Sequence, residues 1–226
     1  MTESSVTRRG LLRGTGAGAA ALGLASCGEN SASSSSEGGP TPDCVLTPEG
    51  TEGPYYLDLD LSRGDLTEGR AGVPLRLDLT VVDTGSCAPI QDAAVDVWHA
   101  DPDGTYSGTE AHGTVGETYL RGVQLTDADG RAEFDTLYPG WYSGRTVHIH
   151  VKVHVEGETV HTGQLYFPED VNGEVAEVAE YARDSGPDTA NADDMFYPST
   201  GAGSTLDLSG SVDQGFTASM VLGVGG

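Results

Sequence analysis

The sequence has little positive charge. Of its 226 residues, 11 are Lys or Arg and 35 are Asp or Glu, so the formal net charge is -24 at pH 7. Lys152 is the only lysine. Nucleic acids are bound through Lys and Arg side chains, so this composition excludes a nucleic-acid partner. It also argues against electrostatic docking on anionic lipid, and it predicts a strongly hydrated acidic surface.

Long apolar stretches are also scarce. The apolar stretch near the N-terminus, residues 14–24, is too short and too rich in glycine to span a membrane as a helix. Glycine, by contrast, is abundant, with 33 residues, and there are 11 prolines. Both residues favour turns, so the composition predicts many short strands in place of long helices.

The N-terminus carries a targeting signal. A twin-arginine pattern at Arg8 and Arg9 precedes the apolar stretch, and Leu24-Ala25-Ser26-Cys27 resembles a lipobox. We therefore expect residues 1–26 to be a twin-arginine lipoprotein signal peptide, with Cys27 lipidated. Such a protein would be exported and anchored to the outer face of the cell membrane by lipid alone. An ordinary cleaved signal with an incidental cysteine is the alternative.

The segment after this signal cannot bury apolar area, because it is rich in Ser and Gly. Residues 27–45 therefore read as a flexible tether, and residues 46–226 as the folded domain. Two further cysteines, Cys44 and Cys87, can pair as a disulfide in an exported protein or remain as two buried thiols. Neither has a Cys or His neighbour at metal-ligand spacing.

The folded domain has the period-2 patterning of strands. Alternation of apolar and polar residues, with turn signals between the runs, predicts strands over residues 75–81, 94–98, 131–134, 147–155, 159–167 and 216–222. Residues 171–183 are compatible with a short helix. The pattern predicts an all-β fold: a β-sandwich of mixed or antiparallel strands with long loops and at most a short helix.

Two histidines stand out on one predicted strand. His148 and His150 are two residues apart, so their side chains point to the same face and can converge on one metal ion. Such a pair also occurs on the polar face of an exposed strand, so the pair alone is a weak signal. The turn-rich segment just before it holds Tyr142 and Arg145 near the pair, and Tyr106 follows another strand. Imidazole suits iron, zinc or copper, whereas phenolate oxygen favours iron(III).

These segments resemble the intradiol ring-cleavage dioxygenases, the family of catechol 1,2-dioxygenase and protocatechuate 3,4-dioxygenase. The matching pieces occur in family order: Thr51-Glu52-Gly53-Pro54-Tyr55-Tyr56, Val97-Trp98-His99-Ala100, Gly104-Thr105-Tyr106, Pro139-Gly140-Trp141-Tyr142, Arg145-Thr146-Val147-His148-Ile149-His150 and Thr162-Gly163-Gln164-Leu165-Tyr166-Phe167-Pro168. The family fold is a β-sandwich, in agreement with the strand pattern.

The resemblance implies a role for each matching residue. Tyr106, Tyr142, His148 and His150 would ligate Fe(III), and Tyr142 would match the tyrosine that leaves the metal when substrate binds. Arg145 would lie beside the substrate ring and Gln164 on the pocket wall. Pro54 and Tyr55 match a stretch that lines the pocket in relatives.

The implied reaction is cleavage of a catechol-type substrate by O2 between its two hydroxyl-bearing carbons, giving a cis,cis-muconate-type diacid. The sequence leaves open which catechol is the substrate and whether the chain forms oligomers. Two other functions remain as alternatives. An exported solute-binding lipoprotein would need no catalytic site, and a zinc or copper enzyme using the His pair would need a third His or a carboxylate as ligand.

Overall fold

The computed structural model describes residues 44–183 and 186–225. The predicted signal peptide, Cys27 and most of the predicted tether lie outside the described residues. The folded part already includes Cys44, which forms a disulfide with Cys87 across a Cα–Cα distance of 5.3 Å.

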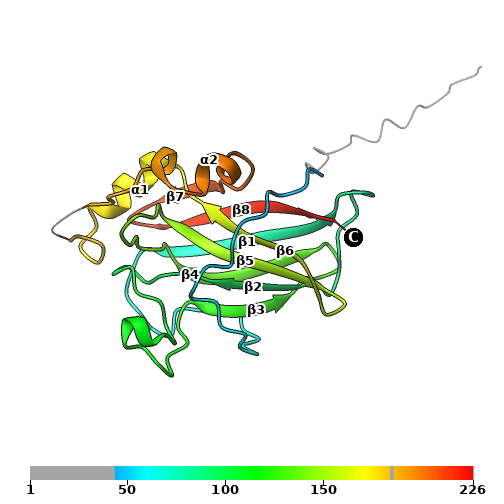
Figure 1. Ribbon diagram of the computed structural model, residues 1–226, viewed down its shortest axis with the longest axis horizontal. Coiled ribbons are helices and arrows are strands. Elements are labelled where there is room, and N and C mark those ends of the chain that lie inside the picture. The colour runs from blue at the N-terminus through cyan, green and yellow to red at the C-terminus, as the bar shows by residue number, and fades with distance from the viewer. Residues whose placement is uncertain (1–43, 184–185, 226) are drawn as a thin grey trace, which may run out of the picture. The chain divides into compact units, whose positions relative to one another are not determined.

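In the described part of the chain, eight strands form two four-stranded sheets, and the strands are labelled in Figure 1. The first sheet has the order β4-β1-β8-β7 and comprises Arg131–Leu137, Pro74–Asp83, Gly215–Val224 and Asp207–Ser211. The second has the order β3-β2-β5-β6 and comprises Arg121–Leu125, Ala94–Trp98, His148–Val155 and Glu158–Tyr166. Strands β1 and β8 pair in parallel, and every other strand pair is antiparallel. The predicted β-sandwich is confirmed.

The core lies between the two sheets. Strand β1 buries Leu75, Leu77, Leu79 and Val81, each at 2% exposure or less, and leaves the residues between them half-buried. Strand β5 faces them with Ile149, Val151 and Val153, all fully buried. Alternation along each strand thus assigns one face to the core, as the period-2 pattern requires.

Two strands and several short helices were not predicted. Strands β3 and β7 lie at sheet edges and contain Gly122 and Gly210, and neither shows apolar alternation. Helix α1 covers Glu169–Ala176, so it starts two residues before the predicted range 171–183 and ends seven residues before the end of that range. A second helix, α2 at Tyr197–Thr200, and three 3-10 turns at Glu110–His112, Asn191–Asp193 and Gly201–Gly203 correct the expectation of at most one short helix.

A segment without regular structure crosses both sheets from the disulfide to the second sheet. We call residues 44–56 the strap; it is blue in Figure 1. Its Thr47 N–H donates to Gly223 O on β8 over 2.9 Å, and its Gly50 N–H donates to Thr162 O on β6, also over 2.9 Å. The strap ends over β5, where a Cβ on Gly53 would lie only 3.1 Å from the His150 ring. Glycine is required there because φ is +69° and the approach is close.

None of the helices in the described ranges is long and apolar enough to cross a membrane.

Candidate metal and substrate site

Strand β5 points His148 and His150 away from the core and under the strap. Both side chains are nonetheless buried, at 3% and 1% exposure, and their Nε2 atoms lie 3.2 Å apart. Trp98 on the neighbouring strand β2 stacks on the His150 ring, with centroids 5.0 Å apart and planes within 5°. The two imidazoles are therefore fixed with their ring nitrogens facing one point.

Hydrogen bonding and burial keep these imidazoles in the form that binds metals. His148 Nδ1 lies 2.7 Å from Thr146 O. Because a carbonyl oxygen only accepts, Nδ1 carries the proton and Nε2 presents its lone pair. Burial, reinforced by the charge of Arg145, lowers the pKa of His148 to about 3. Burial, followed by the effect of His148, also holds the pKa of His150 well below its ordinary value.

Tyr106 reaches the same point from the loop after β2. The loop turns tightly at Asp101, whose Oδ1 accepts hydrogen bonds from the N–H groups of Asp103 and Thr105. Gly104 has φ +78° and approaches so closely that a Cβ there would lie 2.1 Å from Trp141 O. The Tyr106 side chain is fully buried, and its hydroxyl makes no hydrogen bond. Burial, followed by the neighbouring Tyr142, raises the pKa of Tyr106 well above its ordinary value.

Tyr142 completes the group from the loop that leads into β5. Its hydroxyl lies 3.2 Å from His148 Nε2, and its ring stands edge-on to Tyr106 with centroids 5.8 Å apart. Within residues 44–183 and 186–225, no three His, Cys, Asp or Glu side chains are arranged to hold a metal ion. A metal bound here would thus depend on the two phenols.

The donor set fits a hard trivalent cation. Two neutral imidazole nitrogens and two phenol oxygens converge, and a buried hydroxyl without a partner would gain one by ligation. A zinc or copper site built on the His pair would want a third His or a carboxylate, which the described part of the chain does not place there. The structure thus brings together the four predicted ligands, Tyr106, Tyr142, His148 and His150.

Arg145 lies at the edge of this group and is held from three sides. Its Nε donates to Asp194 Oδ2 over 2.7 Å, and its Nη2 donates to Gln164 Oε1. Its Nη1 lies 3.4 Å from the Tyr142 hydroxyl, to which it donates. Arg145 is 9% exposed, so the carboxylate of Asp194 compensates a charge that would be costly to bury alone.

Asp194 is the residue that the sequence did not reveal. It is 2% exposed and accepts hydrogen bonds from the backbone N–H groups of Thr146, Phe196 and Tyr197, in addition to the Arg145 bond. These donors and the Arg145 charge outweigh burial and lower its pKa. The buried arginine indicated that some carboxylate was needed, but nothing in the sequence selected this one among 35 acidic residues.

A cavity of about 400 Å³ opens beside Tyr142 and Arg145. Its other lining residues are Thr51, Gly53, Pro54, Tyr55, Met195 and Phe196. Pro54 and Tyr55 were predicted pocket residues, and the strap carries both. Gln164 is not among the lining residues; it lies behind Arg145, with its Nε2 donating to Thr51 O over 3.0 Å.

Comparisons with known proteins agree with this geometry. The model of the family described as Dioxygenase matches residues 51–186. Chlorocatechol 1,2-dioxygenase of Pseudomonas putida is 33% identical over 142 residues, which cover 51% of this chain and 52% of that protein. The chain spans about half the length of the curated relatives it matches.

Solved structures cover more of the chain. An intradiol ring-cleavage dioxygenase from Tetranychus urticae is 31% identical with a TM-score of 0.76, over 80% of this chain and 95% of that one. The dioxygenase domain of a dioxygenase carbohydrate-binding protein fusion from Streptomyces sp. SirexAA-E is also 31% identical, with a TM-score of 0.59, over 78% and 96% of the two chains. The chain belongs to the intradiol ring-cleavage dioxygenase family.

Proposed function

We propose that this protein is an iron(III)-dependent dioxygenase that cleaves catechol-type aromatics between the two hydroxyl-bearing carbons. One O2 is consumed for each catechol, and both of its oxygen atoms end in the product, a cis,cis-muconate-type diacid. Membership of the family supports the reaction class. Iron is typical of this family, and the donor set of two imidazoles and two phenols fits it.

The observation that carries the proposal is the Tyr106 hydroxyl. A buried hydroxyl without a hydrogen bond costs about 1–3 kcal/mol of stability. This one lies in a group with two imidazoles whose Nε2 atoms face each other at 3.2 Å and with the Tyr142 hydroxyl. Folding into this arrangement is hard to explain by packing alone. A ligated cation would satisfy all four atoms.

The residues around the proposed iron have separable tasks. Bound iron(III) would accept the two catechol oxygens and make the ring reactive toward O2. Tyr142 is the one proposed ligand that lines the cavity, so an incoming catechol meets it first, and its phenol oxygen is placed to take a substrate proton. Arg145 carries a fixed positive charge 3.4 Å from that oxygen and favours negative charge on the bound ring.

A visible absorption spectrum of the purified iron-loaded protein tests the ligand set. Phenolate bound to iron(III) should give a charge-transfer band, and a catechol added without O2 should shift it. Tyr106→Phe and Tyr142→Phe should each change the band. Tyr138→Phe is the matched control, because Tyr138 is also fully buried but packs on Phe167 in the core. Iron-loaded protein without such a band would refute the two tyrosine ligands.

The product tests the reaction separately. With 18O2, the diacid should carry label in both carboxyl groups, because each oxygen atom goes to one of the two cleaved carbons. Cleavage beside the hydroxyl-bearing pair would give an aldehyde acid, and such a product would exclude the intradiol reaction.

We also infer export and lipid anchoring, on the sequence of residues 1–27 alone. The twin-arginine pattern precedes an apolar stretch and a lipobox-like segment ending in Cys27. Incorporation of labelled fatty acid should occur in the natural chain and be lost in Cys27→Ala. Replacing Arg8 and Arg9 together by Lys should retain the protein inside the cell; unchanged export would contradict the twin-arginine assignment.

A further inference from the structure

The outer part of the cavity is apolar. Beyond Tyr142 and Arg145, its side chains come from Pro54 and Tyr55 of the strap and from Met195 and Phe196 of the opposite loop, and the further polar groups are the neutral hydroxyls of Thr51 and Tyr55. Met195 is 71% exposed, so the cavity keeps an apolar surface open to solvent. An open apolar surface of this kind, beside a few convergent polar groups, is typical of a ligand site.

The cavity offers no free positive charge. Arg145 is the only cation among its lining residues, and each of its guanidinium nitrogens is already in contact with a partner: Asp194, Gln164 or Tyr142. The Phe196 ring also covers the guanidinium, with its centroid 4.7 Å from Cζ. The Asp194 carboxylate pairs with the Nε side of Arg145 and so offsets part of its charge; the remaining field is directed at the Tyr142 oxygen.

The neighbouring cation on this side is compensated as well. Lys152 lies under the strap, where its Nζ is 2.5 Å from Glu52 Oε2 and 3.7 Å from the centroid of the Tyr56 ring. Glu52 itself is half exposed, so the strap presents a carboxylate to solvent close to Pro54. The net charge of -24 adds a field that opposes the approach of anions.

We propose, resting on the function proposed above, that the site selects catechols whose ring substituent is uncharged and apolar, and rejects catechols that carry a carboxylate. An apolar substituent is covered by Pro54, Tyr55, Met195 and Phe196. A ring carboxylate in the same place loses water and meets neutral hydroxyls but no cation free of a counter-charge, which is unfavourable. The volume of about 400 Å³ leaves room for a substituent beyond the ring itself.

The ratio of the kcat/KM values for two substrates measures this selectivity. The kcat/KM of the iron-loaded full chain for 4-methylcatechol should exceed that for 3,4-dihydroxybenzoate by about tenfold or more, since about 1.4 kcal/mol of lost interaction corresponds to tenfold. Equal values, or a preference for the carboxylate, would overturn the inference while leaving the reaction intact. Failure to cleave any catechol, including catechol itself, would instead refute the proposed function.

Measurements at high salt distinguish the effect of the cavity on substrate preference from the effect of the net charge. The preference should persist in about 0.5 M NaCl, where repulsion between distant charges is screened. Loss of the preference at high salt would assign it to the whole chain and overturn the role of the cavity.

A charge added at the cavity gives a second, independent test. Met195→Lys should raise kcat/KM for 3,4-dihydroxybenzoate relative to 4-methylcatechol, about tenfold, because the rim then supplies the missing cation. Leu125→Lys adds the same charge at another exposed position outside the cavity and should leave the ratio near that of the natural chain. Met195→Gln, which removes the apolar side chain without adding a charge, should change the ratio much less than Met195→Lys does. A ratio unchanged in Met195→Lys, or raised equally in Leu125→Lys, would contradict the proposal.

Binding of compounds that are not cleaved provides a readout without turnover. By calorimetry, 4-ethylphenol should bind more tightly than 4-hydroxybenzoate to the natural chain, and the difference should narrow in Met195→Lys. Equal affinities for the two phenols in the natural chain would count against the proposed selectivity.

Discussion

Single residues in this protein carry conflicting demands of stability and binding. Tyr106 is the clearest case, because it is fully buried beside Tyr55, whose ring stacks on it at 4.6 Å, yet its hydroxyl has no well-formed hydrogen bond within the described residues and only the Tyr142 hydroxyl close by. The ring contributes to packing, while the hydroxyl is unfavourable until a partner arrives. The consequence is measurable without iron.

Removing this hydroxyl should not destabilise the metal-free protein. We expect Tyr106→Phe to leave the free energy of unfolding unchanged or to raise it by about 1 kcal/mol, because an unsatisfied buried group is lost. Tyr138→Phe should lower it by about 1 kcal/mol, because the Tyr138 hydroxyl donates to Asn172 Oδ1 over 2.7 Å. Denaturant unfolding of both variants measures these two changes in the free energy of unfolding. Equal losses would mean that Tyr106 has a hydrogen-bond partner in solution.

Asp194 contacts the site through Arg145 and the backbone. It joins a loop near the C-terminal end of the fold to the turn before β5, through its bonds to Arg145 Nε and to the Thr146 N–H. Without the carboxylate, the guanidinium would remain buried without its counter-charge. A positioning role therefore predicts effects on both stability and the orientation of Arg145.

We expect Asp194→Asn to lower the free energy of unfolding by about 3 kcal/mol, as is typical when one partner of a buried ion pair is removed. The Nε–H resonance of Arg145 should also move and exchange faster with solvent. Asp188→Asn is the matched control, because Asp188 is exposed and contacts the same turn through the Gly144 N–H at 3.3 Å. Its cost should stay below about 0.5 kcal/mol. Similar losses in both variants would argue against a specific role for Asp194.

At the scale of elements, strand patterning explains what the sequence could predict. The six predicted runs became β1, β2, β4, β5, β6 and β8, with bounds within a few residues of those expected. Strands β3 and β7 were missed because their pairing with a neighbour, and not their own pattern, makes them strands. An edge strand that contains a glycine buries few apolar side chains, so its sequence lacks a clear alternation of apolar and polar residues.

The same distinction holds for the site. The four donor residues were predicted as a set from the resemblance to a family. Local spacing placed His148 and His150 on one face, but the convergence of Tyr106 and Asp194 on them depends on loop packing. Such long-range contacts leave no periodic signal, so only the resemblance to a family anticipated Tyr106, and nothing anticipated Asp194.

Strand β2 also carries a buried acid outside the site, and it predicts a pH dependence. Burial raises the pKa of Asp96 to about 7, although Tyr56, Arg121 and Lys152 act in the opposite direction. An unfolded aspartate has a pKa of about 3.9. Between these values the folded chain binds a proton that the unfolded chain releases, so the contribution of Asp96 to stability decreases as pH rises from about 4 to about 7.

Asp96→Asn should therefore be more stable than the natural chain at pH 8, and its free energy of unfolding should depend less on pH between 4 and 7. Denaturant unfolding at several pH values measures both effects. Asp60→Asn, an exposed change in the same surface hollow, should keep the natural slope. An unchanged slope in Asp96→Asn would show that Asp96 is ionised throughout.

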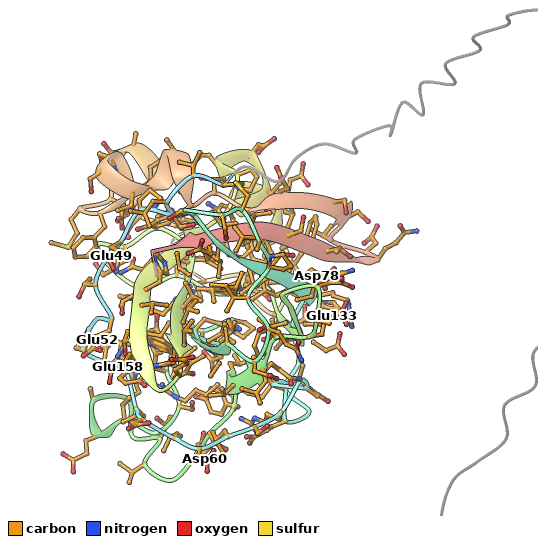
Figure 2. All side chains as sticks on the ribbon, turned by 90° about the vertical axis from the view of Figure 1, so that its right-hand side faces the viewer. Glu49, Glu52, Asp60, Asp78, Glu133 and Glu158 are labelled. Carbon is orange, nitrogen blue, oxygen red and sulfur yellow. A yellow bond between two sulfur atoms is a disulfide. The ribbon has the colours of Figure 1, made fainter. Side chains whose placement is uncertain are left out.

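At the scale of the whole molecule, negative charge is spread over the surface. Figure 2 shows Glu49, Glu52 and Glu158 on one side of the fold and Asp78 and Glu133 on the other. Each arginine on the first sheet pairs with more than one carboxylate. Arg76, for example, lies within 3.3 Å of oxygens of Asp78, Glu133 and Asp135. The remaining carboxylates repel one another, and that repulsion opposes the compact state.

Salt should therefore stabilise this protein. We expect the melting temperature to rise by several degrees between about 0.02 M and about 0.3 M NaCl and then to level off, because screening is nearly complete at that ionic strength. Sodium sulfate at equal ionic strength serves as a comparison: an equal rise in melting temperature indicates charge screening, whereas a larger rise in sulfate indicates preferential exclusion of the salt from the protein surface. A fall in melting temperature with NaCl would mean that the ion pairs outweigh the repulsion.

The disulfide between Cys44 and Cys87 has a mechanical consequence. It fixes the start of the strap to the turn between β1 and β2, while Pro54 and Tyr55 at the strap's other end roof the cavity. A force that pulls on the chain ahead of Cys44 passes through the covalent bond into that turn as well as along the strap. The disulfide thus shares the load, and the part of the strap that lines the cavity is shielded from most of the pull.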